Sequence, residues 1–387
     1  LAIGNNHMTA VDASGNMYAW GRNDYGQLGS ETDGIPQSNV PIFIRSDVDV
    51  VRAGGNTTLA KLKDGTWAQY GYDFYHNIST SVLNEFDDIK ISTMICIGQK
   101  GDGGLSSLYY WGLKENSFGT KSNSSAKPKK IETLTNVVSV YAEDDQLFTI
   151  DANNKLYTWS SGPSELKWLS PVMLNRGAGV QKVAVGKDSF LELNTNGDVY
   201  GYGSTTSDIF GSGQSNPLTY SQIDVPISIK DIALGEGFSV MLGDDGYVYT
   251  MGNNSNGQLG RADNGTNAEF TKIEGLSNIV SVAAGYDYAM ALNSNGDVYV
   301  WGSNESGQLG TSGLTNSFEP VLVMTGCKKI SAGKDFCLAI ANDGSVWGWG
   351  KNTAGQLGIG NKNNQLTPIS ITAATAQGAA LTNIVEI

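Results

Sequence analysis

Reactive and metal-binding side chains are scarce in this chain. Only two histidines and three cysteines occur among its 387 residues. Two histidines cannot supply a three-histidine metal site, and no Ser/His/Asp or Cys/His arrangement stands out. The cysteines, Cys96, Cys327 and Cys337, are too irregularly spaced for a disulfide framework. We expect Cys327 and Cys337 to be buried apolar residues, with a bridge between them as the alternative. The sequence predicts no enzyme active site, no metal and no cofactor.

Basic residues, prolines and long apolar runs are also few. Lys and Arg number 25 against 38 Asp and Glu, and the net charge of −13 repels the phosphate backbone of nucleic acids. We expect a protein partner, basic where it meets this chain, and no nucleic acid. No apolar run is long enough to cross a bilayer, so membrane insertion is not expected. With nine prolines and no Pro- or Ser-rich linker, residues 1–387 are predicted to form one domain, acting as a monomer.

Glycine, in contrast, is abundant, with 49 copies, and its spacing reveals a repeat. One phrase occurs at residues 18–29, 249–260, 299–310 and 347–358, and reads YVWGSNESGQLG in the third copy. The glycine in its fourth position recurs in seven units, and Ser160 takes its place in an eighth. A repeat of 41–50 residues predicts a stack or ring of one small unit. The seven glycines are Gly21, Gly71, Gly112, Gly203, Gly252, Gly302 and Gly350.

Each unit has the pattern of four short strands. In the unit at 278–325, strands are expected at 278–285, 289–292, 297–302 and 319–324, separated by two tight turns and a long loop. Tight hairpin turns favour antiparallel propeller blades over an open solenoid, which needs parallel neighbours. The end of the chain, 383–387, joined to its start, is similar to the first strand and turn of a unit. We therefore expect 383–387 to lie beside the N-terminal hairpin, 1–20, and to close the ring.

The repeated pattern resembles the regulator of chromosome condensation repeat family. Each unit runs in the order AAG, three further residues, an apolar strand, the turn NG or DG, the strand VYVWG and finally GQLG, and the resemblance rests on this order. It covers essentially the whole chain. It implies a β-propeller, usually of seven blades, and nucleotide exchange on a small nuclear GTPase with chromatin binding. The units counted here predict an all-β, closed propeller of eight four-stranded antiparallel blades, with seven as the alternative. The family's histidine in the third position of the inner turn is kept only at His7.

The repeated residues of the phrase are interpreted as scaffold. Large aromatic residues are expected to fill the wedge between blades, leucines to plug the same seam, and glutamines to satisfy backbone groups of the loop, while glycines allow backbone shapes that a Cβ forbids. A set of tryptophans that stacks on carbohydrate is the alternative. The structural set is Trp20, Gly21, Gln27, Leu28, Gln258, Leu259, Trp301, Gly302, Gln308, Leu309, Trp349, Gly350, Gln356 and Leu357.

Two groups of residues are candidates for binding. The middle residue of the inner turn is Asn or Asp in six units. Such residues are ordinary in turns, and the functional interpretation is an acidic rim that receives a basic side chain or a cation. Units between Tyr72 and Phe210 have lost GQLG, and their aromatic loop residues are typical interface anchors. The two groups are Asn6, Asn56, Asp145, Asp188, Asp287 and Asp335, and Tyr72, Phe74, Tyr75 and Trp168.

These observations favour a non-catalytic protein-interaction propeller. Loops rich in Asn, Ser and Thr, and a first residue, Leu1, that is not methionine, lead us to expect a processed or excised domain of a bacterial secreted or surface-associated protein, with a cytoplasmic location as the alternative. Guanine-nucleotide exchange on a small GTPase, as the family resemblance implies, is the second hypothesis. A carbohydrate-binding or carbohydrate-hydrolysing propeller is the third, because two distant carboxylates can meet in a folded chain.

Overall fold

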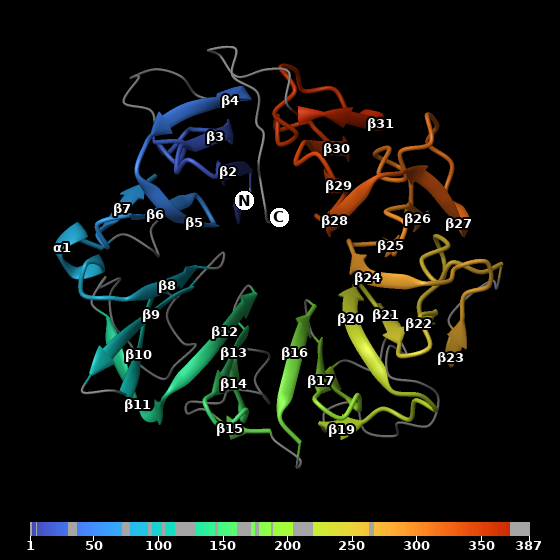
Figure 1. Cartoon of the computed structure of the whole chain (residues 1–387), viewed down its shortest axis with the longest axis horizontal. Coiled ribbons are helices and arrows are strands. Elements are labelled where there is room, and N and C mark those ends of the chain that lie inside the picture. The colour runs from blue at the N-terminus through green and yellow to red at the C-terminus, as the bar shows by residue number, and fades with distance from the viewer. Residues whose placement is uncertain are drawn as a thin grey trace. The chain divides into compact units, whose positions relative to one another are not determined.

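A computed structural model of the chain shows antiparallel sheets that follow one another along the sequence (Figure 1). The structure describes residues 2–4, 6–29, 37–71, 78–91, 95–102, 105–112, 128–143, 146–160, 172–174, 178–186, 189–203, 220–262 and 267–371. By internal contacts the chain divides into two compact regions, each with four of the sheets. The first region holds residues 1–179, 354–360 and 374–378, and the second holds 180–353, 361–373 and 379–387.

The first region contains four sheets, three of them four-stranded and one, β5–β7, three-stranded within the described residues. Their strands are β1 Ala2–Ile3, β2 His7–Val11, β3 Met17–Arg22, β4 Gln37–Arg45, β5 Val48–Gly54, β6 Thr57–Leu62, β7 Trp67–Tyr70, β8 Asp88–Ile91, β9 Ile95–Asp102, β10 Leu105–Gly112, β11 Lys129–Thr135, β12 Val137–Glu143, β13 Gln146–Asp151, β14 Leu156–Ser160 and β15 Val172–Met173.

The second region contains four four-stranded sheets, each built from consecutive strands. The strands are β16 Val180–Val185, β17 Ser189–Asn194, β18 Val199–Gly203, β19 Ser221–Gln222, β20 Ile229–Gly235, β21 Phe238–Gly243, β22 Val248–Gly252, β23 Asn267–Lys272, β24 Ile279–Ala284, β25 Tyr288–Asn293, β26 Val298–Gly302, β27 Ser317–Met324, β28 Cys327–Ala332, β29 Phe336–Ala341, β30 Val346–Gly350 and β31 Gln365–Ser370.

The predicted fold class is confirmed: the chain is an all-β propeller, and its eight sheets are the eight blades. Seven of the eight repeat positions lie in a strand of their own sheet and Gly71 directly follows β7, so eight, and not seven, is the blade count. The expectation of one domain over 1–387 stays a prediction. In the part of the chain that the structure describes, no helix is long and apolar enough to cross a membrane.

Within the described residues the second blade shows three strands, β5–β7. The one-turn helix α1, Thr80–Leu83, lies further along the chain, before β8. The side chain of Asn84, just after α1, accepts the backbone N–H of Trp67 at 2.7 Å. The Trp67 indole N–H donates to the carbonyl of Phe86 at 3.0 Å. These groups satisfy the outer edge of β7 that a strand would otherwise pair.

The fourth-position glycine of the repeat is required by a close approach of two backbones. At Gly302 φ is +104°, and a Cβ there would lie 2.6 Å from the carbonyl oxygen of Asp287 in the inner turn. The next residue, Ser303, donates its backbone N–H to that same oxygen at 2.9 Å. A side chain at Gly302 would separate the end of β26 from the inner turn, so the repeat keeps glycine at this place.

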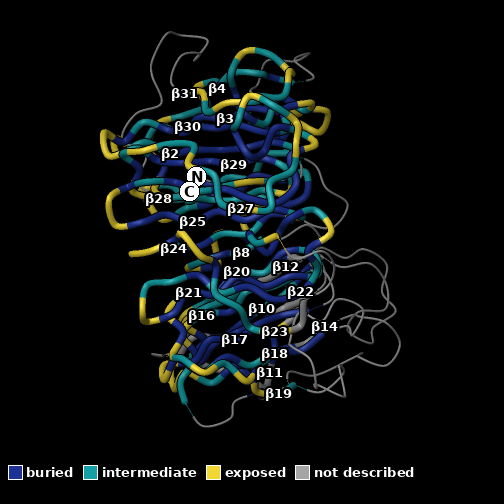
Figure 2. Tube along the Cα trace, turned by 90° about the vertical axis from the view of Figure 1, so that its right-hand side faces the viewer, coloured by how far each residue is buried: buried dark blue, intermediate teal, exposed yellow. Residues whose placement is uncertain are grey.

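The core lies between neighbouring sheets, and the second strands β17, β21 and β25 are buried on both faces. In β25 every residue is buried. Ala289 and Ala291 pack with the sheet before, against Val240. The intervening Met290 points the other way and packs with the sheet after, against Cys337. Figure 2 shows buried residues along the strands and exposed residues at the turns. A strand flanked by two sheets reads as a continuous apolar run rather than an alternating one.

Two expectations about chain ends and cysteines can be compared with the structure. Residues 383–387 lie outside the described residues. On β2, the side away from β3 is paired with β1, at Ala2↔Thr9 and Ile3↔Met8. Cys327 and Cys337 are both free and buried, which confirms the interpretation as core residues over the alternative of a bridge.

Candidate functional site

The inner turn and the GQLG loop of a blade lie at the same end of its sheet. In the seventh blade Tyr288, at the start of β25, pairs with Gly302, at the end of β26, so the turn at 286–287 and the loop that begins at Ser303 emerge together. The Nε2 of Gln258, from the loop of the sixth blade, lies 3.4 Å from the Asp287 carboxylate. We call the turns at 236–238, 286–288 and 334–336 and the loops at 253–260 and 303–310 the loop face of the second region.

Each GQLG loop is held by its own side chains. In the seventh blade Gln308 accepts the backbone N–H of Ser306 at 2.8 Å, and Asn304 accepts that of Leu309 at 2.9 Å. Gln27, Gln258 and Gln356 accept in the same way from Tyr25, Asn256 and Ala354. The sequence interpretation overlooked the asparagine, although Asn23, Asn254, Asn304 and Asn352 stand two residues after the glycine in all four copies.

The tryptophans of the phrase join one blade to the next. Trp301 donates its indole N–H to the carbonyl of Gln258 at 2.9 Å, and Trp349 donates to that of Gln308 at 2.9 Å. Trp20 makes the same bond to Gln356 at 2.8 Å. All three side chains are fully buried. They are therefore not available to stack on a carbohydrate, which removes the residues on which that interpretation rested. The leucines that follow, Leu28, Leu259, Leu309 and Leu357, are buried as well.

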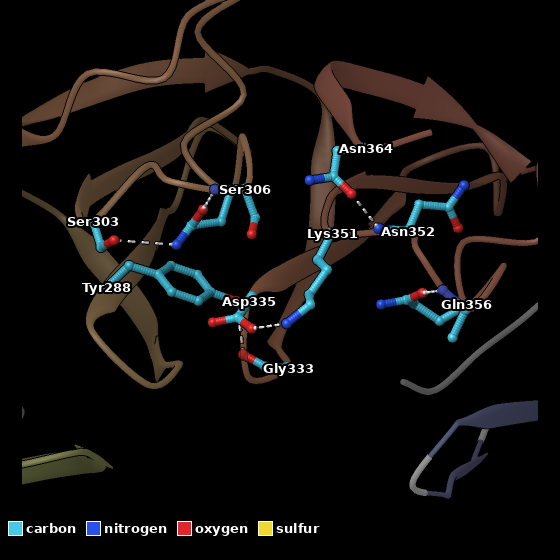
Figure 3. Close-up of polar contacts among 11 residues, drawn as sticks. Tyr288, Ser303, Ser306, Gly333, Asp335, Lys351, Asn352, Gln356 and Asn364 are labelled. Carbon is cyan, nitrogen blue, oxygen red and sulfur yellow. Dashed lines mark hydrogen bonds and ion pairs between the residues drawn. The ribbon is translucent and has the colours of Figure 1, made fainter. Parts of the chain in front are cut away.

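The inner turns of the loop face are linked to one another. Glu236 donates its backbone N–H to the carbonyl of Tyr286 at 2.8 Å, and Tyr286 donates to that of Lys334 at 3.0 Å. The Lys334 ammonium lies 4.6 Å from the centre of the Tyr286 ring, a cation–π contact. Lys351, which follows Gly350, forms an ion pair with Asp335 at 2.8 Å (Figure 3). The three turns are thus linked by backbone hydrogen bonds and side-chain contacts.

Asp287 is the most perturbed acid of this surface. Its pKa is raised, first by partial burial and then by the nearby carboxylates of Glu236, Asp335 and Glu305. Lys334 offsets part of this effect. Lys351 pairs with Asp335, and the remaining carboxylates, Asp287, Glu236 and Glu305, outnumber the one other nearby cation, Lys334, so the cluster keeps a net negative charge. Such an arrangement favours the approach of a cationic side chain, which would relieve the repulsion.

The third residue of the inner turn links its blade to the following one. His7 is buried, its Nε2 lies 2.8 Å from the hydroxyl of Thr58, and that hydroxyl donates to the carbonyl of Gln27 at 2.8 Å. Burial lowers the pKa of His7 to about 4, so the ring is neutral. In the seventh blade Tyr288 takes this place and donates to the carbonyls of Gly333, at 2.9 Å (Figure 3), and Phe336. These residues therefore make hydrogen bonds between one blade and the next.

The other predicted turn and arc residues are placed as follows. Asn6 and Asn56 are half-buried, and the carbonyl of Asn6 accepts the N–H of Arg22 at 2.8 Å. Asp145 and Asp188 lie outside the described residues, as do the four aromatic residues of the divergent arc, Tyr72, Phe74, Tyr75 and Trp168. Whether an acidic rim runs through all blades, and whether the arc binds a partner, stay predictions.

The buried acid Glu192 was not anticipated from the sequence. Glu192 lies in β17 where other blades have Met241, Ala291 or Ala339, and it is 1% exposed. Tyr220 donates its hydroxyl to Glu192, and burial raises the pKa of the carboxyl to about 7. Within the described part of the chain, no group of three His, Cys, Asp or Glu side chains is arranged to hold a metal ion.

The sheets and their loops define the protein class: a β-propeller whose blades are joined by a repeated Trp–Gly…Gly-Gln-Leu-Gly element. The regulator of chromosome condensation (RCC1) repeat matches residues 14–60, 245–292, 295–340 and 343–387, and a second form of this repeat matches 229–258, 279–308 and 327–356. Together these segments cover more than half of the chain, which therefore belongs to the RCC1 repeat family.

Several known proteins resemble the chain over much of its length. It is 26% identical over 320 residues to the human E3 ubiquitin-protein ligase HERC2, covering 71% of this chain and 6% of that protein. It is 25% identical over 263 residues to the ultraviolet-B receptor UVR8 of Arabidopsis thaliana, covering 59% and 58%. The chain thus spans less than two thirds of the length of these relatives.

Two solved structures share the fold. Yeast RCC1 (Prp20), in its complex with Kap60, aligns with a TM-score of 0.66 at 17% identity, covering 97% of this chain and 88% of that one. Human WBSCR16 aligns with a TM-score of 0.62 at 17% identity, covering 84% and 98%. At this identity the likeness concerns the fold alone.

Proposed function

We propose that this propeller is a non-catalytic protein-interaction module, and that its loop face in the second region receives a basic segment of the partner. The observation that carries the proposal is the cluster around Asp287. Partial burial raises the pKa of this acid, and three nearby carboxylates raise it further. Tyr286 beside it is exposed. A Lys or Arg of the partner would relieve the repulsion, while an exposed tyrosine supplies rigid contact area.

The contrast between repeated residues that hold the fold and loop residues that vary supports a binding role. The repeated tryptophan, glutamine, asparagine and glycine residues are engaged in contacts within and between blades. The positions left for recognition are the loop tips and turns, which differ from blade to blade, such as Asp24-Tyr25 and Glu305-Ser306. Binding surfaces are commonly built from variable loops on a rigid frame. We further propose that the module is bacterial, secreted or surface-associated, as its composition suggests.

The test compares two triple variants with the same change in charge. Asp287→Asn, Glu236→Gln and Glu305→Gln alter the loop face. The control, Asp244→Asn, Glu274→Gln and Asp343→Asn, alters exposed acids at the opposite ends of their sheets. With a fluorescent Lys/Arg-rich peptide as probe, anisotropy should show at least a tenfold loss of affinity for the first variant and little change for the control. Binding of the unchanged protein should weaken with salt.

Two outcomes would count against this function. Equal binding of the peptide by both triple variants would remove the loop face as the site. Recovery of the same partners from a cell extract by both would do so as well. The divergent arc is tested separately with Phe74→Ala, Tyr75→Ala and Trp168→Ala, because the two surfaces share no residue.

Guanine-nucleotide exchange is the second candidate function, and family membership favours it. The chain is also 23% identical over 293 residues to the Ras guanine nucleotide exchange factor C of Dictyostelium discoideum, covering 68% of this chain and 19% of that protein. Release of a fluorescent nucleotide from candidate small GTPases decides this point. Acceleration at micromolar protein supports exchange, and its absence across the tested GTPases leaves the binding module as the function.

A further inference from the structure

Two tight turns of the second region carry the dipeptide Asn-Gly with an exposed asparagine. Asn196-Gly197 lies between β17 and β18, and Asn295-Gly296 lies between β25 and β26. We propose that Asn196 and Asn295 are sites of spontaneous modification to aspartate and isoaspartate in the folded protein, and that the isoaspartate weakens the contact of its turn with the following blade. This inference concerns the blades themselves and does not depend on the proposed function.

The modification needs only water as a reagent. Asparagine is a thermolabile residue, and a following glycine has no side chain to hinder the attack of its backbone nitrogen. The nitrogen of Gly296 bonds to the side-chain carbonyl carbon of Asn295, and the side-chain nitrogen leaves as ammonia with the proton of the Gly296 N–H. Water then opens the cyclic imide. Addition at the side-chain carbonyl gives aspartate, and addition at the main-chain carbonyl gives isoaspartate, whose main chain is longer by one carbon.

A third Asn-Gly pair, Asn256-Gly257, has the same dipeptide in a different setting. Its asparagine is half-buried in the GQLG loop of the sixth blade, and the side-chain oxygen accepts the amide of Asn316 at 3.3 Å. The backbone N–H of Asn256 donates to the side chain of Gln258, whose carbonyl accepts the indole N–H of Trp301 at 2.9 Å. Motion of Asn256 therefore disturbs the seam between two blades, and we expect this residue to be protected.

The hydrogen bond of the attacking nitrogen does not distinguish the three sites. Gly197, Gly296 and Gly257 each donate their N–H to the carbonyl three residues earlier, at 3.1, 3.0 and 3.1 Å. Each bond must open before the reaction. At Asn196 and Asn295 it lies at the end of a hairpin, where local opening has a low free energy. The difference in reactivity should therefore follow the exposure and the contacts of the asparagine.

The glycines of the two turns contact the blade that follows. The carbonyl of Gly197 accepts the N–H of Ile229, the first residue of β20, at 2.9 Å. The carbonyl of Gly296 accepts that of Cys327, the first residue of β28, at 2.9 Å. The approach is close, because a Cβ at Gly296 would lie 2.8 Å from the carbonyl oxygen of Cys327. A longer main chain before the glycine would shift its carbonyl and weaken the bond to the next blade.

Aspartate, in contrast, is compatible with this turn. In the sixth blade Asp245 stands before Gly246, and the carbonyl of Gly246 accepts the N–H of Ile279 at 3.0 Å. In the first blade Ser14 takes the same place. The negative charge alone therefore leaves the contact intact, and isoaspartate is the product that disturbs it.

The test follows the three asparagines in one sample of the full chain. The protein is incubated at mildly alkaline pH in isotope-labelled water, and peptide mass spectrometry measures the label at each residue. Asn196 and Asn295 should react about tenfold faster than Asn256, or more, and the three rates should become similar in urea. Equal rates in the folded protein, or a difference that persists in urea, would overturn the inference. So would no reaction at either turn while the unfolded chain reacts.

A second measurement tests the effect on the next blade. Amide hydrogen exchange at the start of β28 should rise about tenfold in the fraction of aged protein that contains isoaspartate at residue 295. Freshly prepared Asn295→Asp has the charge without the longer chain, and aged Asn295→Ser cannot form the imide, so both should exchange like the unaged protein. Unchanged exchange in the isoaspartate fraction, or an equal rise in fresh Asn295→Asp, would contradict the proposed effect.

Discussion

At the scale of single residues, each conserved position of the repeated Trp–Gly…Gly-Gln-Leu-Gly element makes a different contact. The tryptophan donates a hydrogen bond to a backbone carbonyl in the loop of the neighbouring blade. The glutamine and asparagine side chains accept backbone N–H groups within that loop. The glycines allow close approach of two backbone segments. Against this background, His7 and Glu192 stand out as buried ionisable groups at the seams between blades. Their burial makes the stability of the fold depend on pH in opposite directions.

Glu192 should destabilise the protein as pH rises. Its pKa is raised from 4.5 to about 7, so the folded state holds a proton that the unfolded state releases at lower pH. Stability from this group is complete below pH 4.5 and is lost as pH rises through 7, by about 3 kcal/mol in total. Urea denaturation of Glu192→Gln at pH 5 and pH 8 should show this part of the pH dependence removed. A variant with the same pH dependence as the unchanged protein would refute the prediction.

His7 should destabilise the protein as pH falls. Its pKa is lowered from 6.5 to about 4, so the unfolded state takes up a proton that the folded state resists. Stability from this group is complete above pH 6.5 and is lost as pH falls through 4, by up to about 3 kcal/mol. His7→Gln, which can still donate to Thr58, should flatten the loss of unfolding free energy between pH 7 and pH 4.5. An unaltered slope over that range would argue against this account.

At the scale of elements, the blade is a rigid unit because its third strand ends against its inner turn. The glycine at that junction was visible in the sequence as the regular marker of the repeat, but the reason for it was not. The reason is a contact between two backbones that are 15 residues apart, at Asp287 and Gly302. Only the folded blade shows that the turn carbonyl occupies the place of a Cβ.

Replacement of Gly302 should therefore lower the free energy of unfolding by more than its positive φ alone predicts. Gly302→Ala combines an unfavourable φ with a Cβ 2.6 Å from a backbone oxygen, and should lower the unfolding free energy by about 3 kcal/mol or more. Gly275→Ala is the control, because Gly275 has φ of +82° and no atom within 4 Å of its Cβ position. It should cost about 1 kcal/mol. Chemical denaturation of both variants checks the difference, and equal losses would mean that the contact is relieved at little cost.

At the scale of the whole molecule, most of the fold was readable from the repeat. The strands expected at 278–285, 289–292, 297–302 and 319–324 correspond to β24–β27 within about two residues at most ends. The eight sheets follow from the eight glycine or serine markers. The second blade was less predictable, because α1 and the contact of Asn84 with β7 have no periodic signature in the sequence.

The candidate site was less accessible to sequence reasoning than the fold. The turn triplets identified where Asp287 and Asp335 would lie. They did not reveal that Lys351 neutralises one acid while Lys334 rests on Tyr286. These choices depend on where long, flexible side chains come to rest, and the sequence gives no periodic signal for that. Glu192 was missed for a related reason. A single acid in a strand can be recognised as unusual only when its side chain is known to be buried.

The joint between neighbouring blades has a consequence for how such a protein can be altered. Trp301 and Trp349 recognise a main-chain oxygen, and every amino acid carries one. The backbone path of the loop is therefore constrained, while the identity of many of its side chains is not. Loop tips such as Glu305-Ser306 can be exchanged for foreign recognition sequences of the same length. The hydrogen bond between the loop carbonyl and the tryptophan of the adjoining sheet should then be kept.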